Sequence, residues 1–307
     1  MKIIRAANEL AAKNRKVCLA IGFFDGVHLG HQQIIRQTLA DARQHEALPL
    51  VLTFDRHPNT VVAPNRVPRL IYTLPQRLRA IESLGVEVLL LIHFDSDFSE
   101  QTGEQFVRNL RRDLGQIRSI CVGANFFFGH RRSGNVTLLR NLGTELNFSV
   151  HGLAAVSLDG KVISSTRIRE SISAGNLDAA SQMLGRAYSL CGTVVRGDGV
   201  GRKLGFPTAN IDTEGLTLPP NGVYAVHAEV CRRGFRAVLN IGRRPTLQHP
   251  NPQLQVEVHL LDFNGELYGK ELEVIFVDKL RDEMKFASLS GLSEQIARDI
   301  RDAAARF

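Results

Sequence analysis

Residues 15 to about 160 alternate short apolar runs with segments of helical periodicity, and this alternation constrains the fold more than any other feature of the chain. The expected strands are Val17–Phe23, Leu50–Phe54, Val86–Ile92, Ile117–Val122 and Phe148–Val156. The expected helices between them are His31–His45, Leu74–Leu84 and Gln105–Leu114. Such alternation predicts an α/β fold with a doubly wound, Rossmann-like parallel sheet that is covered by helices on both faces. Sheets of this kind bind ligands where the carboxyl ends of the strands turn into helices.

A different rhythm begins after about residue 185, where short strand-like segments follow one another closely. They are Leu190–Val195, Val223–Val230, Phe235–Ile241, Leu254–Leu261 and Leu272–Val277. Turn signals such as Arg233-Gly234 and Asn264-Gly265 join them. Short strands at close spacing predict a small antiparallel β-barrel or sandwich. We place the domain boundary at Gly185-Arg186, which gives domains of residues 1–185 and 186–307.

Helical spacing returns at the end of the chain. One apolar stripe is formed by Leu292, Ile296, Ile300, Ala303 and Phe307. Ser290 precedes this stripe and suits the N-cap position, because its side chain can accept a hydrogen bond from a free backbone N–H. We expect this terminal helix to pack on the barrel through its apolar stripe.

Composition narrows the classes of function. The net charge is +7, but the basic residues come as scattered pairs and the chain contains no Trp. Small polyphosphates explain this charge as well as nucleic acid does, so we expect no nucleic-acid partner. The four cysteines form no CxxC pair, which disfavours zinc and redox sites. No apolar run approaches the roughly 18 residues of a membrane span, and the first residues lack a signal-peptide core. We expect a cytoplasmic protein, monomeric or weakly homo-oligomeric, with no membrane partner.

The stretch GFFDGVHLGHQQ, residues 22–33, follows the first expected strand. Its glycines allow a tight turn into a helix whose free N–H groups and partial positive charge suit phosphate. His28 and His31 are three residues apart and project the same way from the first helical turn. There they would donate hydrogen bonds to phosphoryl oxygens and stabilise transition-state charge. The alternatives are structural histidines or a metal site, although HxxH without a nearby carboxylate or cysteine is a weak metal signal.

Three further stretches can complete this site. SSTRIRE, residues 164–170, is either a triphosphate cradle or a Ser-capped helix with a solvated basic face. GANFFFGHRRSGN, residues 123–135, runs from a strand end into a loop rich in glycine and arginine. Its three adjacent Phe cannot all face one core, so we expect some of them to line a pocket for a flat aromatic ring. TFDRHP, residues 53–58, also ends a strand and turns.

These four stretches, in this order and spacing, resemble the adenylyltransferase module of bacterial bifunctional riboflavin kinase/FAD synthetases. That module belongs to the nucleotidyltransferase superfamily, and His28-Leu29-Gly30-His31 resembles the (H/T)xGH signature of this superfamily. The resemblance implies transfer of AMP from ATP to FMN with release of pyrophosphate, and His28 and His31 as the catalytic residues. It implies ATP binding by Gly22, Phe23, Asp25, Gly26, His28, His31, Ser164, Ser165, Thr166, Arg167 and Arg169. It implies flavin binding by Phe54, Pro58 and Asn125. Asn135 departs from the pattern, because many relatives carry an acidic residue there.

The second half contains GTVVRGDGVGRKLGFPTANID, residues 192–212, a glycine-rich loop that is neither a Walker loop nor a complete GxGxxG. Thr208 and Asn210 offer oxygen ligands two residues apart, which suits Mg²⁺ bound with substrate phosphates. A Pro-containing turn capped by Thr is the alternative. Glu257 lies mid-strand on the face away from the aliphatic row. Such a carboxylate is either solvated or paired with a cation, or it is a base for a hydroxyl that attacks phosphate.

The stretches GDGVGRKLGFPTANI, PPNGVYAV, LNIGRRPT, VEVHLLDFNGELYG and KLRDEMKF resemble the riboflavin kinase module of the same bifunctional enzymes. The resemblance implies Glu257 as the catalytic base on the ribityl 5′-hydroxyl, and Arg281 and Glu283 in loops that bind the flavin. It implies binding of ATP and Mg²⁺ by Gly199, Gly201, Lys203, Pro207, Thr208 and Asn210, with Thr208 and Asn210 as metal ligands.

Together the two resemblances imply a bifunctional enzyme with riboflavin, FMN and ATP as substrates and Mg²⁺ as cofactor. Two rival hypotheses remain at this stage. One is a kinase whose adenylyltransferase half is degenerate, or a transferase acting on another phosphate ester. The other is a flavin- or RNA-binding regulator on an inherited fold, which predicts ligand binding without turnover.

Overall fold

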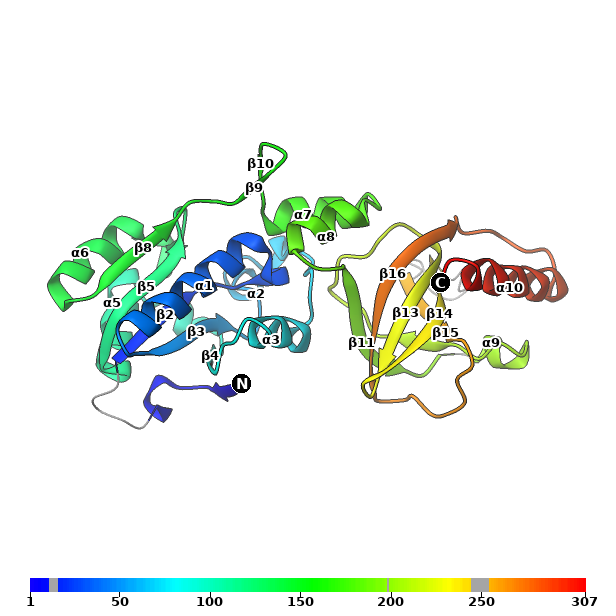
Figure 1. The fold of residues 1–307 in the computed structure, drawn as a ribbon, viewed down its shortest axis with the longest axis horizontal. Coiled ribbons are helices and arrows are strands. Elements are labelled where there is room, and N and C mark those ends of the chain that lie inside the picture. The colour runs from blue at the N-terminus through cyan, green and yellow to red at the C-terminus, as the bar shows by residue number, and fades with distance from the viewer. Residues whose placement is uncertain (11–15, 198, 244–253) are drawn as a thin grey trace. The chain divides into compact units, whose positions relative to one another are not determined.

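The computed structural model describes residues 1–10, 16–197, 199–243 and 254–307, which fold as two compact units (Figure 1). The sheet unit consists of residues 1–69 and 74–165, and the barrel unit of residues 70–73 and 166–307. These compact units are not domain boundaries, so the predicted boundary between the two domains at 185/186 stays a prediction. Part of the LNIGRRPT stretch, from Arg244 to Thr246, lies outside the described residues.

The sheet unit is built on six parallel strands in the order β1-β4-β3-β2-β5-β8. Their bounds are β1 Lys2–Ile4, β2 Lys16–Ile21, β3 Leu48–Phe54, β4 Val88–Ile92, β5 Gln116–Gly123 and β8 Ser149–Leu153. All five predicted strands of this sheet are confirmed, and so is its parallel, doubly wound class. Strand β1 was not predicted, because three residues are too few to show a period.

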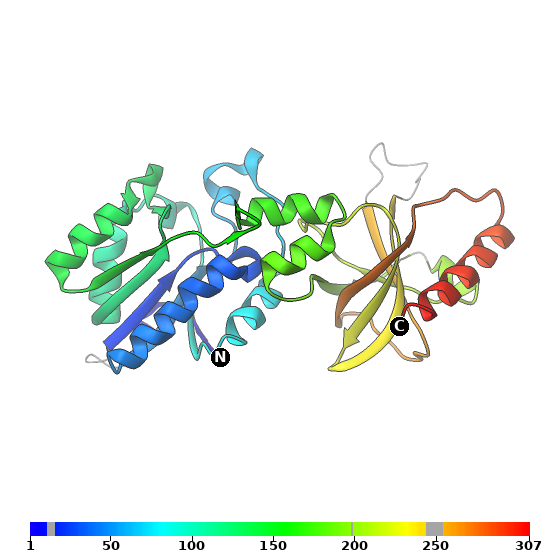
Figure 2. The ribbon, with the colours of Figure 1, turned by 45° about the horizontal axis from the view of Figure 1, so that its top comes forward.

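Helices cover both faces of this sheet (Figures 1 and 2). On one face, α1 (Leu29–Gln44) and α3 (Leu74–Glu82) bury Ile34, Ile35 and Ile81 against β2, β3 and β4. On the other face, α5 (Gly103–Leu114) and α6 (Val136–Leu146) pack against the remaining side chains of the same strands. Helix α6 was not predicted. Burial on both faces is why these strands read as continuous apolar runs.

Shorter elements connect the strands and helices of the sheet unit. They are η1 Ala7–Glu9, η2 Asp25–Val27, α2 Asn59–Val62, η3 Pro64–Arg66, α4 Ser96–Ser99, β6 Phe127–Phe128, η4 His130–Arg132, β7 Gly134–Asn135, β9 Ser157–Leu158 and β10 Lys161–Val162. Among them, η2 and the β6–η4–β7 segment follow the carboxyl ends of β2 and β5, where the predicted site lies.

The barrel unit contains a closed antiparallel barrel in the order β11-β12-β15-β14-β13-β16, which confirms the predicted barrel. Its strands are β11 Ser189–Val195, β12 Ala209–Ile211, β13 Gly222–Val230, β14 Arg233–Arg243, β15 Leu254–Leu260 and β16 Glu271–Arg281. The helices of this unit are α7 Ser165–Ser173, which starts at the last residue of the sheet unit, α8 Leu177–Leu184, α9 Val200–Lys203 and α10 Leu289–Ala304. Closure leaves no exposed sheet edge and fills the interior with alternate side chains of every strand.

Two local predictions in this unit are wrong. The turn between β13 and β14 falls on Cys231 and Arg232, at φ 51° and 62°, so Gly234 lies inside β14. Helix α10 is capped by Ser288, whose side chain accepts a hydrogen bond from Gly291 N–H at 3.1 Å, and not by Ser290. Ser290 therefore lies in the first helical turn. Over the described ranges, no helix combines the length and the apolar character needed to cross a membrane.

Candidate active sites

The strand order places the first candidate site at a topological switch point. From β2 the chain proceeds to β3 and β4 on one side, whereas β5 and β8 lie on the other. Ala20 near the end of β2 pairs with Cys121 near the end of β5, so both carboxyl ends meet at one edge. Helix α1 begins at this edge. Crevices at such points are where open α/β sheets bind ligands.

His28 and His31 form one structural element at the start of α1. Their rings stack with centroids 3.6 Å apart and an interplanar angle of 21°. His28 is the N-cap of the helix, and its Nδ1 accepts a hydrogen bond from His31 N–H at 3.4 Å. Gly30 permits this packing, because a Cβ there would lie 3.2 Å from His28 Cε1. The two imidazoles therefore lie together at the positive end of a helix, which suits an anionic ligand.

The turn that carries His28 has strained backbone geometry. Phe24, Gly26 and Val27 adopt φ values of 56°, 74° and 40°. Each non-glycine residue in such a region costs of order 1–3 kcal/mol and persists only where its surroundings hold it. Ser165 Oγ donates a hydrogen bond to Asp25 O at 3.1 Å, so the start of SSTRIRE contacts this turn.

Of the other predicted ATP-binding residues, some lie at the turn in the sheet unit and others belong to the barrel unit. Gly22 lies beside the turn, where a Cβ would come within 2.8 Å of Phe24 Cε1. Thr166, Arg167 and Arg169 belong to the barrel unit, where Arg169 Nη2 donates a hydrogen bond to Thr166 Oγ1 at 3.3 Å. Their role toward the histidines stays a prediction.

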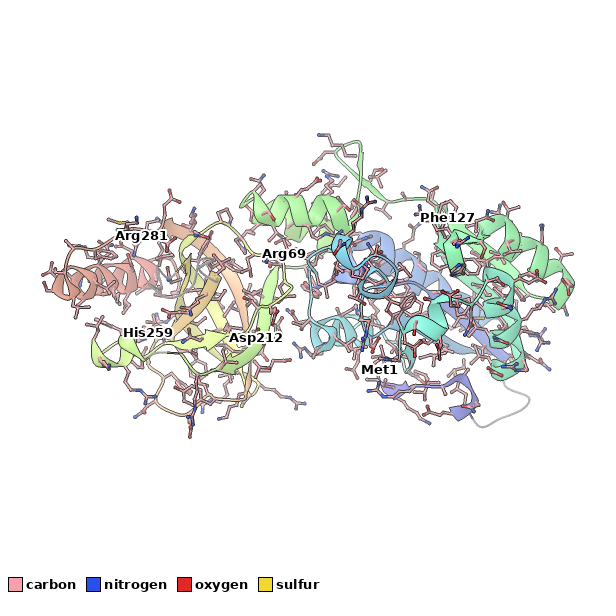
Figure 3. The ribbon with its side chains drawn as sticks, turned by 180° about the vertical axis from the view of Figure 1, so that it is seen from behind. Met1, Arg69, Phe127, Asp212, His259 and Arg281 are labelled. Atoms are coloured by element: carbon pink, nitrogen blue, oxygen red, sulfur yellow. The ribbon has the colours of Figure 1, made fainter. Side chains whose placement is uncertain are left out.

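An aromatic cavity of about 940 Å³ adjoins the same edge of the sheet. Predicted flavin-binding residues Phe54 and Pro58 line it, whereas Asn125 is not among its lining residues. Phe126, Phe127 and Phe128 all line it, and the rings of Phe126 and Phe128 stack at 5.3 Å. Phe127 is half exposed at the surface (Figure 3). The expectation that these phenylalanines line a pocket is confirmed, and the ring faces suit a flat aromatic ligand.

Three basic residues and Glu100 line one part of this cavity. His130, Arg131 and Arg132 line it on η4, and the Arg132 guanidinium lies 4.9 Å from the centre of the Phe127 ring. Asn135 caps α6 by accepting a hydrogen bond from Leu138 N–H at 2.9 Å. An amide at this position therefore performs a structural task that a carboxylate could also perform.

The second candidate site is a cavity of about 290 Å³ on the outside of the barrel. Thr208, Glu257, Arg281 and Glu283, predicted from separate stretches of the sequence, all line it. Figure 3 marks Arg281 in this unit. Glu257 pairs in register with Asn210 on β12, and residues paired in this way project to the same face of the sheet. Glu257 lines the cavity, whereas Asn210 is not among its lining residues.

The glycine-rich loop packs closely on the two predicted metal ligands. A Cβ on Gly197 would lie 2.2 Å from Asn210 Nδ2, and a Cβ on Gly201 would lie 3.1 Å from Thr208 Oγ1. The loop backbone therefore lies close to both side chains. Lys203 and Pro207 are exposed and are not among the cavity-lining residues. The remaining predicted residue, Gly199, adopts φ 67°.

Helix α10 is a wall of this cavity as well as a packing element. Leu292, Ile296 and Ile300 face the cavity, and so does Asp299. Asp299 holds Arg281 in a bidentate ion pair, with Nε–Oδ1 and Nη2–Oδ2 distances of 2.8 and 2.7 Å. The ion pair is largely buried. It fixes the Arg281 guanidinium at the cavity mouth, because the fork of an arginine matches a carboxylate in one orientation.

Comparisons with known proteins agree with this arrangement of two sites. A family model for FAD synthetase matches residues 10–167, and a model for riboflavin kinase matches residues 184–307. A bifunctional riboflavin kinase/FMN adenylyltransferase of Escherichia coli (strain K12) is 37% identical, covering 97% of this chain and 96% of its own. The chain belongs to the bifunctional riboflavin kinase/FMN adenylyltransferase family. It is an enzyme of flavin cofactor biosynthesis.

Further relatives extend over the whole chain. A bifunctional riboflavin kinase/FMN adenylyltransferase of Buchnera aphidicola (subspecies Schizaphis graminum) is 34% identical, covering 98% of this chain and 97% of its own. A solved structure described as a macrolide-efflux protein from Streptococcus pneumoniae has a TM-score of 0.81 and 30% identity, with 98% of each chain covered. That description names a different activity, whereas the family models match both the sheet unit and the barrel unit.

Asn240 and Asp299 line the cavity on the barrel but were not predicted from the sequence. Asn240 pairs in register with Glu257 on the side opposite Asn210. The lone amide in the apolar run AVLNI could have indicated Asn240 as a site residue, because an isolated polar residue is uncommon in an apolar strand. Asp299 offered no such signal, since acidic residues are ordinary on the exposed face of a helix.

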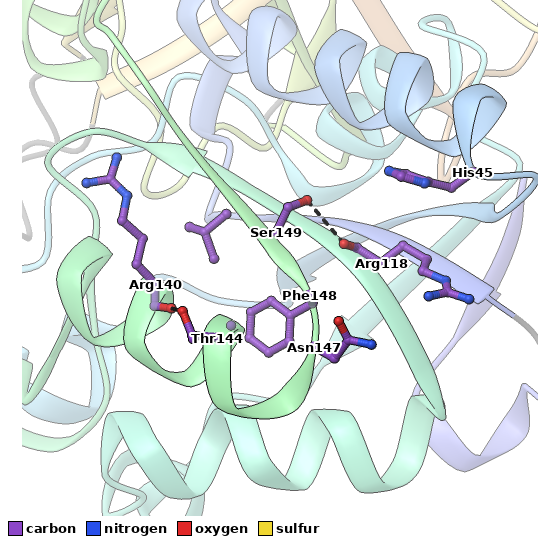
Figure 4. A pocket seen from close by; sticks show the side chains of 9 residues that line it. His45, Arg118, Arg140, Thr144, Asn147, Phe148 and Ser149 are labelled. Atoms are coloured by element: carbon purple, nitrogen blue, oxygen red, sulfur yellow. Dashed lines mark hydrogen bonds between the residues drawn. The ribbon is translucent and has the colours of Figure 1, made fainter.

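A further hollow, of about 600 Å³, lies at the opposite edge of the parallel sheet (Figure 4). Arg118 and Ser149 from the amino ends of β5 and β8 line it, joined by a hydrogen bond from Ser149 Oγ to Arg118 O at 3.1 Å. His45 and Asn147, the C-caps of α1 and α6, also line it. Helix C-termini carry partial negative charge, which offsets the basic side chains and disfavours an anion here.

Proposed function

We propose that the barrel unit phosphorylates riboflavin with ATP to give FMN, and that the sheet unit then transfers AMP from a second ATP to FMN to give FAD and pyrophosphate. The observation that carries this proposal is the presence of two cavities with different chemistry. One joins aromatic walls to paired imidazoles at a helix N-terminus. The other joins Glu257 to hydroxyl and amide side chains. We also infer a cytoplasmic enzyme.

In the kinase reaction, Glu257 accepts the proton of the ribityl 5′-hydroxyl as its oxygen attacks the γ-phosphorus of ATP, and ADP leaves. Thr208 and Asn210 would hold Mg²⁺ with the ATP phosphates. These hard oxygen donors, one just before β12 and one within it, have glycine backbone close to both side chains and fit such an ion. Bound Mg²⁺ would neutralise phosphate charge. Arg281, fixed by Asp299, orients the flavin at the cavity mouth.

In the adenylyl transfer, a phosphate oxygen of FMN attacks the α-phosphorus of ATP, and pyrophosphate leaves. No protein nucleophile is required. The imidazoles of His28 and His31 and the free N–H groups of α1 donate hydrogen bonds to oxygens that gain charge in the transition state. The aromatic cavity holds the isoalloxazine ring between phenylalanine faces.

Supplying the purified chain first with riboflavin and Mg-ATP, and separately with FMN and Mg-ATP, tests this proposal. Chromatography that resolves riboflavin, FMN and FAD should show FMN followed by FAD in the first reaction, and FAD with equimolar pyrophosphate in the second. Formation of FMN without FAD would mean that the adenylyltransferase half is inactive. Tight flavin binding without turnover would instead support a regulator.

A further inference from the structure

Arg77 is a buried arginine that joins the ends of two neighbouring strands. It lies on α3 and is 3% exposed. Its Nη1 donates a hydrogen bond to Phe23 O at 3.1 Å, and its Nη2 donates one to Phe54 O. The guanidinium also lies 4.3 Å from the centre of the Phe23 ring. One side chain therefore ties the segment that follows β2 to the carboxyl end of β3.

The charge of Arg77 is retained although its burial is costly. Burial lowers the pKa of Arg77 to about 10, while the negative charges of Asp25 and Asp55 raise it. The group thus stays protonated at neutral pH. Its Nε is buried without a hydrogen-bond partner within the described part of the chain. A buried cation with incomplete hydrogen bonding contributes little to stability alone, which indicates that Arg77 has a positioning role.

The two carbonyl groups that Arg77 holds belong to two parts of the adenylyltransferase site. Phe23 O precedes the strained turn that ends at His28, and Thr53 Oγ1 also donates a hydrogen bond to it at 3.0 Å. Both Phe23 and Phe54 line the aromatic cavity. The Arg77 guanidinium therefore holds the turn of residues 24–28, called here the histidine turn, at a fixed distance from the cavity wall at Phe54.

We propose that Arg77 is a positioning residue for adenylyl transfer: it holds the histidine turn and the aromatic cavity in the relative placement that in-line attack requires. The inference rests on the proposed function of the sheet unit. Lysine can replace it only in part, because an ammonium group keeps the charge but lacks the planar fork that reaches two carbonyl oxygens at once. Misplacement of reacting groups by about 1 Å typically costs about a hundredfold in rate.

The test compares Arg77→Met, which keeps much of the side-chain volume, with Arg77→Lys, which keeps the charge. Arg79→Met on the exposed face of the same helix is the matched control. For each full-length variant, kcat and KM for FMN and ATP are measured in FAD formation, with circular dichroism to give the folded fraction. FMN formation from riboflavin in the same chain reports on the other unit.

We expect kcat for FAD formation to fall about a hundredfold in Arg77→Met and by a smaller factor in Arg77→Lys, with KM values within about threefold of wild type. FMN formation and the Arg79→Met control should be unchanged. A kcat that equals wild type after correction for the folded fraction would overturn the inference. So would a large rise of one KM at unchanged kcat, since that marks a binding subsite. Absence of FAD formation by the wild-type chain would instead refute the proposed function, and the inference with it.

Discussion

Replacing His28 by asparagine should separate the chemistry of the sheet unit from its folding. His28 is buried to 6% exposure, stacks on His31 and caps α1. His28→Ala would remove the imidazole and also the cap, which alone costs about 1 kcal/mol. Asparagine is a good N-cap, so His28→Asn removes the imidazole and retains the cap. The remaining loss can then be assigned to the reaction.

The expected loss is large enough to distinguish from unfolding. Removal of one preorganised donor to a transition-state oxyanion costs about 10²–10³ in kcat, or about 3–4 kcal/mol. A domain that retains only about 3 kcal/mol of stability is still more than about 99% folded, because each 1.36 kcal/mol is a factor of ten. Partial destabilisation would thus lower the rate by about one per cent, whereas lost catalysis lowers it by orders of magnitude.

The assay measures FAD formation from FMN and Mg-ATP, and FMN formation from riboflavin and Mg-ATP, in the same preparation. His28→Asn should lose the first activity by about 10²–10³ and keep the second. The matched control is His45→Asn, which makes the same substitution at the other end of α1. Equal loss of both activities, or FAD formation within about threefold of wild type, would refute the role that we assign to the imidazole.

Three further predictions concern groups in both units. Glu257→Gln should lower FMN formation by about 10²–10⁴ and leave FAD formation from supplied FMN unchanged, as chromatography of both products would show. Asp299→Asn should raise KM for riboflavin about tenfold, because Arg281 loses a charged partner worth at least about 1.5 kcal/mol; an unchanged KM would contradict the orienting role. Burial raises the pKa of Asp41, but hydrogen bonds, including one from Gln37 at 2.7 Å, outweigh this and hold it below its usual value. Asp41→Asn should therefore destabilise the sheet unit by about 1–3 kcal/mol in urea at neutral pH, and this deficit should vanish as the pH falls through the folded-state pKa, below about 4.

Periodicity predicted most of the long elements because each of them buries one face or both faces, although the 11-residue helix α6 was missed. The five predicted strands of the sheet and the five predicted strands of the barrel all form, with ends that shift by a few residues. The missed strands of the parallel sheet and the barrel, β1 and β12, have three residues each and cannot show a period. The two-residue strands β6, β7, β9 and β10 were missed for the same reason. The N-cap prediction of Ser290 missed the true cap by two residues, because Ser288 is also a serine and only the backbone geometry shows where the helix begins.

Sequence patterns did not indicate which strands pair with one another. Alternation indicated which face of its strand Glu257 occupies, but it does not indicate which strand lies alongside. The register that joins Asn210, Glu257 and Asn240 into one polar row is set by barrel closure. Arg77 was missed for a related reason: a charged residue on an amphipathic helix is expected to face solvent, and its burial follows from the placement of two strand ends.

The two proposed sites handle phosphate by opposite means, and the nucleophiles explain why. A ribityl hydroxyl holds its proton at neutral pH, so the kinase cavity requires a base, and Glu257 lies there beside hydroxyl and amide groups. The phosphate of FMN has a second pKa of about 6 and is already ionised, so the adenylyltransferase site requires donors and no base. Its histidine pair at a helix N-terminus supplies them. The amide of Asn135 is compatible with this chemistry, because its structural task is to cap α6.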